Sequence, residues 1–404
     1  MRPSWKGWAC TPSTMKRFLD DLAGRLEAIR AGGLGRALRD PEGIDFSSND
    51  YLGLSRHPLL LGRLAERLSR MEGPPGSPAS RLLRGNRPEH RALEERLARW
   101  KGTEAALLFP SGYQANLAVL TALLGPRDRA LSDSLNHASL IDGLRLSGSR
   151  KAVFPHLDLD AAEEELRRPH PGGRTFLVTE SLFSMDGDEA PLGRCADLAE
   201  RWNAVLIVDD AHATGVHGAE RGSGLVEEHG IEGRAGAIVS TFGKALGMAG
   251  AFVAGPRIVI DWLVNRARPF IFTTAPPPLL VAAIEVLLDL AAEEPERRGA
   301  VLDRAARLRA ALEARGARRP PGRGAIVPVI LGSNERALSV AADLQARGFD
   351  VRAIRPPSVP EGTARLRISV HADHSEGEID ALAEALAGAL ERIPADVFPQ
   401  AASP

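Results

Sequence analysis

Short apolar runs alternate with helical patterns through the middle of this 404-residue chain, and this alternation constrains the fold more than any other feature. Amphipathic segments such as LDAAEEELRR (159–168) and RCADLAERW (194–202) separate the runs. Continuous apolar strands divided by helices are typical of a mostly parallel sheet with helices on both faces. The sequence therefore predicts an α/β fold, with strands at AALLF (105–109), RALSD (129–133), KAVF (151–154), TFLVT (175–179), AVLIVDD (204–210), AIVSTF (237–242) and GAFVAG (250–255).

The chain is longer than the roughly 250–300 residues at which a single core stops growing, so more than one domain is expected. The three prolines of TTAPPPLL (273–280) interrupt the pattern, because proline disfavours helix. Beyond them a helix-rich stretch leads to three apolar runs that suggest a smaller α+β domain. We predict an N-terminal segment at 1–55, a large domain at 56–280 and a small C-terminal domain at 281–404.

The charge balance excludes some classes of partner. A formal net charge of −1 argues against nucleic-acid binding, because such surfaces carry a clustered basic excess. Arginine runs such as RLRAALEARGARR (307–319) are interspersed with Glu and Leu at helical spacing, and we interpret them as solvated helix faces.

Cysteine content and the apolar segments bear on the compartment. Cys10 and Cys195 are too few for a disulfide framework or a thiolate metal site, which fits a reducing compartment. The longest apolar stretch, PLLVAAIEVLLDLAA (278–292), contains two acidic residues and is shorter than a membrane span, so it predicts a core helix. Residues 1–18 carry basic residues without an apolar h-region, so we expect no secretory signal and a cytoplasmic location. Organelle targeting stays a weaker alternative, and Met15 is an alternative start.

Polar residues collect where the apolar runs end, which is where ligands bind in such sheets. Taken alone, each has a structural explanation: a histidine satisfied in a core, a carboxylate capping a turn, a lysine in solvent. Asp209 is harder to explain in this way, because it closes a run of Val and Ile where an ionised carboxylate is costly without a cation. The residues are Ser111, Gly112, Tyr113, His137, Glu180, Ser184, Asp209, His212, Thr241 and Lys244.

Three common motifs do not account for this set. A P-loop needs Ser or Thr after its lysine, but Ala245 follows Lys244. The segments GLGRAL (33–38) and GSGLVE (222–227) lack the third glycine of a dinucleotide fingerprint. Metal binding through HATGVH (212–217) or HADH (371–374) lacks an evident set of further ligands, so we expect no metal.

The remaining combination matches the needs of pyridoxal 5′-phosphate (PLP). This cofactor takes a Schiff-base lysine and an acidic partner for its pyridine nitrogen. Lys244 and Asp209 supply these two groups, His137 is suited to lie over the ring, and glycine and hydroxyl donors suit the phosphate.

The chain resembles the α-oxoamine synthases, a branch of the fold-type I PLP enzymes, over about residues 20 to 392. The resemblance implies a fold-type I transferase with a mostly parallel central sheet and a smaller α+β domain. It rests on DFSSNDYLGL, SRLLRGNRPEHRALEERLA, FPSGYQANLAVL, LNHASLIDG, TESLFSMDGDEAPL, VDDAHATGVHG, STFGKALG, FIFTTAPPP and RLRISVHADH, which follow one another in the family's order.

The resemblance also implies roles for individual residues. Lys244 bonds to the cofactor, Asp209 pairs with the pyridine nitrogen and His137 stacks on the ring, and these three are the implied catalytic residues. Further cofactor contacts are implied for Gly112, Tyr113 and Thr241 at the phosphate, for Ser184 and His212 at the phenolic oxygen, and for Thr274 of a second subunit in a homodimer. Implied substrate contacts are Arg367 and Asn49 at the amino-acid carboxylate, with Arg36, His137 and Ser358.

Within the family, AIRPPSVPEGTARLR (353–367) is similar to the branch that condenses L-alanine with a pimeloyl thioester in biotin biosynthesis. The acyl donor can be a CoA or a carrier-protein thioester. A sibling acyltransferase, such as a glycine C-acetyltransferase, and a non-catalytic partner subunit are the alternatives. The family's glycine-rich loop reads GSPASR here (76–81). Pro78 and Ala79 restrict the backbone conformations of this loop, so the resemblance does not predict the geometry of the acyl channel.

Overall fold

The structure is a computed structural model that describes residues 13–170, 172–316 and 319–393. Its contacts divide the chain into two compact units. The larger unit comprises residues 46–328 and 368–383, and the smaller one comprises 329–367 with the described parts of 1–45 and 384–404. The domain limits expected from the sequence stay a prediction.

A seven-stranded sheet forms the centre of the larger unit. Its strands, in spatial order, are β2 (Ala105–Phe109), β8 (Ala251–Gly255), β7 (Ala235–Thr241), β6 (Ala204–Asp209), β5 (Thr175–Glu180), β3 (Arg129–Asp133) and β4 (Arg150–Phe154). Strand β8 runs antiparallel to both of its neighbours, β2 and β7, and the other pairings in this sheet are parallel. Every apolar run predicted as a strand of this core is a strand, and the predicted mostly parallel sheet is confirmed.

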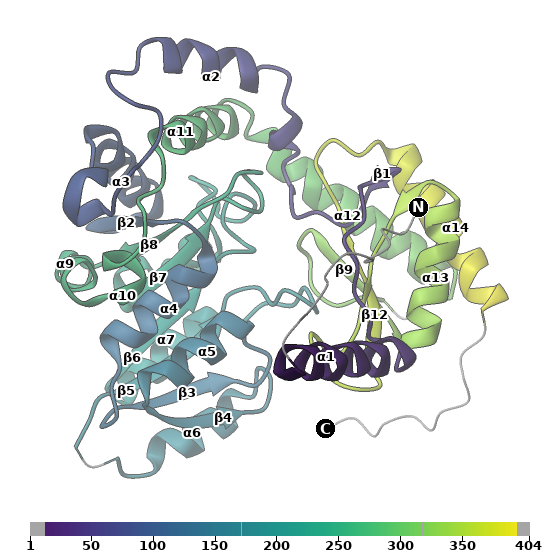
Figure 1. Cartoon of the computed structure of the whole chain (residues 1–404), viewed down its shortest axis with the longest axis horizontal. Helices are drawn as coiled ribbons and strands as arrows, with labels where there is room; N and C mark the ends of the chain where they lie inside the picture. Colours follow the sequence, from purple (N-terminus) through teal and green to yellow (C-terminus); the bar gives the residue numbers. More distant parts are fainter. Residues whose placement is uncertain (1–12, 171, 317–318, 394–404) are drawn as a thin grey trace. The chain divides into compact units, whose positions relative to one another are not determined.

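Helices α4 (Gly112–Leu123), α5 (Ala138–Ser147), α9 (Arg257–Arg266) and α10 (Arg268–Ile271) cover one face of the sheet. Alternate strand residues such as Leu107, Val239 and Val253 pack with them into one buried cluster, as the period of two in a strand requires. Figure 1 shows α4 and α5 lying across the sheet. The other helices of this unit are α2 (Leu60–Ser69), α3 (Pro88–Lys101), α6 (Leu159–Arg167), α7 (Leu192–Arg201), α8 (Leu225–Glu228), α11 (Pro278–Glu293) and α12 (Glu296–Ala314).

The apolar stretch after the three prolines forms α11, whose buried residues run from Pro278 to Leu290, as predicted for a core helix. No helix within the described ranges is long and apolar enough to cross a membrane. Among the described cysteines, Cys195 is a buried thiol, and burial raises its pKa to about 12. Cys10 lies outside the described residues.

The arginine run on α12 corrects one prediction. Arg307 is exposed and pairs with Asp380, as a solvated face requires. Arg309, however, is 2% exposed, and its guanidinium donates to the carbonyl oxygens of Gly324 (2.9 Å) and Ile326 (2.6 Å). The interpretation as a solvated face was therefore wrong for Arg309, because backbone acceptors distant in the sequence satisfy its donors.

The remaining elements are small strands and three helices. Strand β1 (Ile44–Asp45) pairs in parallel with β10 (Phe349–Asp350). A three-stranded sheet has the order β11 (Ala353–Ile354), β12 (Ala364–Ser369) and β9 (Ile326–Gly332). The helices are α1 (Ser13–Ala31), α13 (Asn334–Ala346) and α14 (Glu376–Arg392).

Candidate active site

The carboxyl ends of five strands bring the predicted cofactor residues to one edge of the large sheet. Strands β3, β5, β6 and β7 are parallel, and β2 shares their direction because two antiparallel pairings separate it from β7. Ten polar residues follow or close these strands, so the edge carries the chemistry expected of this fold. They are Ser111, Gly112, Tyr113, His137, Glu180, Ser184, Asp209, His212, Thr241 and Lys244.

Asp209 closes β6 and is 7% exposed. Its carboxylate accepts hydrogen bonds from the Asn116 side-chain amide (2.6 Å) and from the Ala211 backbone N–H (3.0 Å). It forms no ion pair with any residue that the structure describes. Because a buried carboxylate is costly without a cationic partner, the site offers a strong acceptor for a positively charged N–H group of a ligand.

A chain of hydrogen bonds connects Asp209 to His137. The Asn116 amide also donates to the Ser139 hydroxyl (2.8 Å), which lies 2.7 Å from Nδ1 of His137. The His137 side chain keeps an exposed face, yet surrounding protein lowers its pKa by desolvation, an effect that Asp209 opposes and Lys244 reinforces. The imidazole is therefore neutral near pH 7 and able to lie against an uncharged ring.

Lys244 follows β7 in a tight turn and is half-buried. The Gly247 N–H donates to the Lys244 carbonyl oxygen (2.8 Å), and Gly247 has φ +64°. A Cβ at Gly247 would lie 2.7 Å from that of Ser55, so this turn requires glycine both for its backbone and for space. The charge of Lys244 lowers the pKa of both His137 and Glu180, which places its amine near them.

Glu180 closes β5 beside Asp209, its partner in the register of the two strands. Its carboxyl is 2% exposed and accepts a hydrogen bond from the His137 backbone N–H. Burial and the neighbouring Asp209 raise its pKa well above the ordinary value, while Lys244 and the His137 N–H oppose the shift. Glu180 is thus a buried carboxylic acid beside the predicted catalytic residues.

The start of α4 forms a cradle for an anion. Ser111 caps this helix, and the N–H groups of Gly112 and Tyr113, as its first residues, have no acceptor within the helix. A Cβ at Gly112 would lie 3.7 Å from the Thr241 Cβ, so the hydroxyl-bearing end of β7 adjoins the helix terminus. Helix N-termini of this kind bind phosphate, because the N–H groups and the helix dipole both attract negative charge.

A second chain of hydrogen bonds contains His212. The Tyr51 hydroxyl lies 2.7 Å from Nδ1 of His212 and donates to the Asn49 side-chain oxygen (3.2 Å). Tyr51 is 1% exposed. The structure thereby brings together two residues predicted from the sequence, and the tyrosine that joins them was missed.

Ser184 is buried in the loop after β5. His156, which sequence analysis did not select, holds this loop against the end of β3. Its ring contacts Asp133 through Nδ1 (2.9 Å) and Asp188 through Nε2 (2.8 Å). These two carboxylates overcome the effect of burial and raise the pKa of His156 to about 10.

Four predicted residues are not joined to this cluster by a described contact. Thr274 is exposed between α10 and α11. Arg367 is buried in β12 of the smaller unit. Arg36 and Ser358, in the same unit, line a small cavity of about 100 Å³. Their substrate roles stay predictions.

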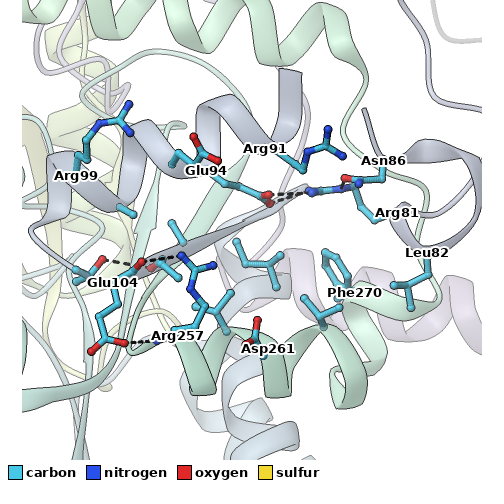
Figure 2. Close-up of a pocket in the computed structure, with 18 residues that line it drawn as sticks. Arg81, Leu82, Asn86, Arg91, Glu94, Arg99, Glu104, Arg257, Asp261 and Phe270 are labelled. Carbon is cyan, nitrogen blue, oxygen red and sulfur yellow. Dashed lines mark hydrogen bonds and ion pairs between the residues drawn. The ribbon is translucent and has the colours of Figure 1, made fainter. Parts of the chain in front are cut away.

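A larger cavity, shown in Figure 2, lies in the larger unit and is separate from the candidate active site. It has a volume of about 560 Å³, and none of the predicted site residues lines it. At the edge of this cavity the Arg81 guanidinium donates two hydrogen bonds to the Glu94 carboxylate (2.8 and 2.9 Å), so the charges of these two side chains are paired. Within the described ranges, no group of three or more His, Cys, Asp or Glu residues could hold a metal ion.

Comparison with known proteins identifies the family. The family model described as aminotransferase class I and II matches residues 41–386. The chain belongs to this family. Named relatives within it include the 8-amino-7-oxononanoate synthase of Anaeromyxobacter dehalogenans (strain 2CP-1), 45% identical over 93% of this chain and 97% of that protein. The 8-amino-7-oxononanoate synthase of Bordetella petrii is also 45% identical, over 92% of this chain and 97% of that protein.

Solved structures have folds similar to that of this chain. A serine palmitoyltransferase solved with PLP is 28% identical, with a TM-score of 0.85, and the match covers 95% of this chain and 99% of that one. The 8-amino-7-oxononanoate synthase of Francisella tularensis is 25% identical, with a TM-score of 0.75, over 87% of this chain and 99% of that one. The predicted fold-type I architecture and the resemblance are therefore confirmed.

Proposed function

We propose that this chain is a PLP-dependent 8-amino-7-oxononanoate synthase, an acyltransferase of biotin biosynthesis. It joins L-alanine to the acyl group of a pimeloyl thioester and releases CO₂ and the free thiol. The observation that carries the proposal is the buried carboxylate of Asp209, which forms no ion pair with a described residue and lies at the same sheet edge as Lys244, His137 and the α4 terminus. The 45% identity to named synthases over nearly the whole chain supports the choice of reaction.

The donor set at the sheet edge fits PLP. Asp209 is suited to the protonated pyridine nitrogen, since it has no other cationic partner among the described residues. The N–H groups of Gly112 and Tyr113, with the Thr241 hydroxyl, suit the phosphate. In this proposal His137 would lie on the ring, and Ser184 and His212 would contact the phenolic oxygen. When bound, PLP supplies an electron sink for a carbanion at the amino-acid Cα.

The chain's own residues then have defined tasks. The Lys244 amine would anchor the cofactor, and as a free amine it would take the proton from the substrate Cα as general base. A base needs a neutral amine, and the raised pKa of the neighbouring Glu180 carboxyl lessens the stabilisation that this group gives to a charged amine. Asp209, oriented by Asn116, holds a proton at the pyridine nitrogen.

The substrate contacts belong to the same proposal. Arg367 and Asn49 bind the alanine carboxylate, for which the planar guanidinium fork is suited. Arg36 and Ser358 contact the acyl substrate. Asn49 is held by Tyr51, which also contacts His212, so the alanine and cofactor contacts share one support.

We infer a homodimer in the cytoplasm, in which Thr274 of each subunit reaches the phosphate in the other. The dimer is supported by the exposure of Thr274 and of the nearby Phe272 in the single chain. The Phe272 side chain is 71% exposed. A hydroxyl and an aromatic ring exposed together in the segment between α10 and α11 suit an interface with another chain.

A product assay tests the reaction. Purified protein with PLP is offered L-alanine, glycine or L-serine, each with pimeloyl-CoA, acetyl-CoA or palmitoyl-CoA, and products are identified by mass spectrometry. We expect 8-amino-7-oxononanoate from L-alanine and pimeloyl-CoA as the main product. Preferential use of glycine with acetyl-CoA would reassign the chain to a sibling acyltransferase.

A further inference from the structure

The Tyr51 hydroxyl can do more than hold its two neighbours in place. It lies 2.7 Å from Nδ1 of His212 and 3.2 Å from the Asn49 side-chain oxygen, and the tyrosine side chain is buried. A tyrosine hydroxyl carries one proton, so it donates to one of these two acceptors at a time. The direction of that O–H bond therefore decides which hydrogen bonds the two neighbours can make in turn.

The second ring nitrogen of His212 is the one that remains for the cofactor. Because Nδ1 faces Tyr51, Nε2 is the atom that would contact the phenolic oxygen of PLP in the proposed site. In a neutral imidazole one nitrogen carries the proton and the other accepts. When Tyr51 donates to Nδ1, the ring proton is held on Nε2 and His212 donates to the phenolic oxygen. When Tyr51 turns its proton away, Nδ1 of a neutral ring bonds the hydroxyl oxygen only by taking the proton from Nε2.

The Asn49 amide competes for the same proton. Its oxygen accepts hydrogen bonds and its nitrogen donates them, so the nitrogen is the atom that would bind the carboxylate of L-alanine. With the nitrogen on a carboxylate, the amide oxygen faces Tyr51, which is the orientation of the 3.2 Å contact. Binding of alanine then draws the Tyr51 proton toward Asn49 and away from His212.

The three groups are held in position by the backbone around them. The Tyr51 N–H donates to the Asn49 carbonyl oxygen (2.7 Å), which fixes the turn between these two residues. The turn that carries His212 is fixed by the Ala211 N–H, which donates to the Asp209 carboxylate (3.0 Å). Tyr51 and His212 are both buried, and a hydrogen bond shielded from water in this way has a larger electrostatic effect on its partners.

We propose that Tyr51 is a positioning residue whose single proton is shared between His212 and Asn49. The inference rests on the proposed function and deepens it, because it connects the alanine carboxylate to the phenolic oxygen of PLP. His212 donates to that oxygen most strongly when Asn49 does not compete for the Tyr51 proton. Bound alanine weakens this donor, so the phenolic oxygen keeps more negative charge while the amino acid occupies the site.

A double-mutant cycle of Tyr51→Phe and Asn49→Ala tests the shared proton. The measurement is the midpoint pH at which the visible absorption of the PLP-loaded enzyme changes, recorded without substrate. Negative charge on the phenolic oxygen retains the neighbouring proton of lysine-bound PLP to a higher pH. Tyr51→Phe removes the donor to His212 and should raise the midpoint by roughly half a pH unit or more. Asn49→Ala removes the competing acceptor and should lower the midpoint, but it should have no effect in the Tyr51→Phe background.

Ser48→Ala is the matched control. The Ser48 hydroxyl lies on the same segment, where it accepts from the Asp50 N–H (3.3 Å) and lies 3.3 Å from Nε2 of His371. We expect Ser48→Ala to leave the midpoint unchanged. Additive shifts, shifts of Tyr51→Phe and Asn49→Ala in the same direction, or an equal shift with Ser48→Ala would overturn the proposal. The charged groups at the sheet edge are retained in every variant, so their effect on the midpoint cancels; they are Glu180, Asp209 and Lys244.

The cycle separates this inference from the proposed function, because it needs bound PLP but no acyl donor. Formation of 8-amino-7-oxononanoate by wild type together with additive shifts would refute the shared proton alone. Opposite, non-additive shifts without that product would reject the reaction and support the role of Tyr51. If Tyr51→Phe takes up no PLP, Asn49→Ala decides: a midpoint below that of wild type supports the proposal, and an unchanged or higher midpoint overturns it. Failure of wild type to take up PLP would overturn both.

Discussion

Asp209→Asn should nearly abolish turnover while the protein stays folded and binds PLP. The substitution keeps the shape of a side chain that is 7% exposed, and it removes a buried charge that has no ionic partner among the described residues. Such a change costs little stability, since an unpaired buried charge is itself unfavourable. The Asn116 side-chain oxygen has no hydrogen-bond partner, so this amide can turn to accept from the new one.

We expect the loss of activity because Asp209→Asn removes the charge that keeps the pyridine nitrogen of PLP protonated. A neutral amide does not hold that proton, and a shift of about two pKa units in the ring nitrogen corresponds to roughly 2.7 kcal/mol. If the whole shift acts on carbanion formation, the rate falls about a hundredfold. The assay is kcat with L-alanine and pimeloyl-CoA, alongside PLP content and thermal unfolding of the same preparation.

The adjacent residue provides a matched control. Asp210 is buried, as Asp209 is, but it pairs with the buried Lys101 (2.6 Å). Asp210→Asn leaves that lysine charge uncompensated and should destabilise the fold by roughly 3–5 kcal/mol. We expect instability from Asp210→Asn and inactivity from Asp209→Asn. If Asp209→Asn instead unfolds at lower temperature and the folded fraction turns over normally, Asp209 is structural and the reasoning is refuted.

Three further predictions concern the substrate, the subunits and pH. Arg367→Ala should weaken L-alanine binding by about ten- to a hundredfold, as seen by spectral titration of the PLP enzyme, with partial rescue by Arg367→Lys; an unchanged dissociation constant would remove Arg367 from the substrate site. If Thr274→Ala alone is impaired, mixing it with Lys244→Ala subunits should restore activity, because each mixed dimer has one intact site; no recovery would indicate self-contained sites. The pKa of His156 is raised to about 10, so its contribution to stability is complete below about pH 6.5 and is lost as pH rises to about 10. His156→Gln should accordingly destabilise the protein in denaturant titrations at pH 6 and have little effect above pH 10, and an equal loss at both values would exclude this linkage.

The sheet was predictable because each apolar run has a length and boundary typical of a strand, and Asp209 stands directly at the end of one. The hydrogen bond from helix α4 to that carboxylate could not be predicted from the sequence. Asn116 lies 93 residues from Asp209 in the sequence, so no local pattern connects the two residues. Its position among Ala and Leu residues on the buried side of α4 was the one available signal.

Tyr51 illustrates the same limit, since the contact to His212 spans 161 residues. The motif that contains Tyr51 suggested Asn49 as a substrate contact. The hydrogen bonds of the Tyr51 hydroxyl could not be predicted from that motif, because they depend on the folded structure. Glu180 was visible at a strand end, whereas its burial beside Asp209 depends on the pairing of β5 with β6. Sequence patterns thus locate the edge of the site, and the hydrogen bonds that orient its residues depend on tertiary pairing.

The most direct test of the central claim is the covalent attachment point of the cofactor. Borohydride treatment of the PLP-loaded protein, followed by peptide mass spectrometry, fixes the cofactor on the lysine to which it is bonded. We predict the reduced adduct on Lys244 alone, with Lys101 as an internal comparison because it is buried and paired with Asp210. An adduct on another lysine, or none after reconstitution with PLP, would contradict the account.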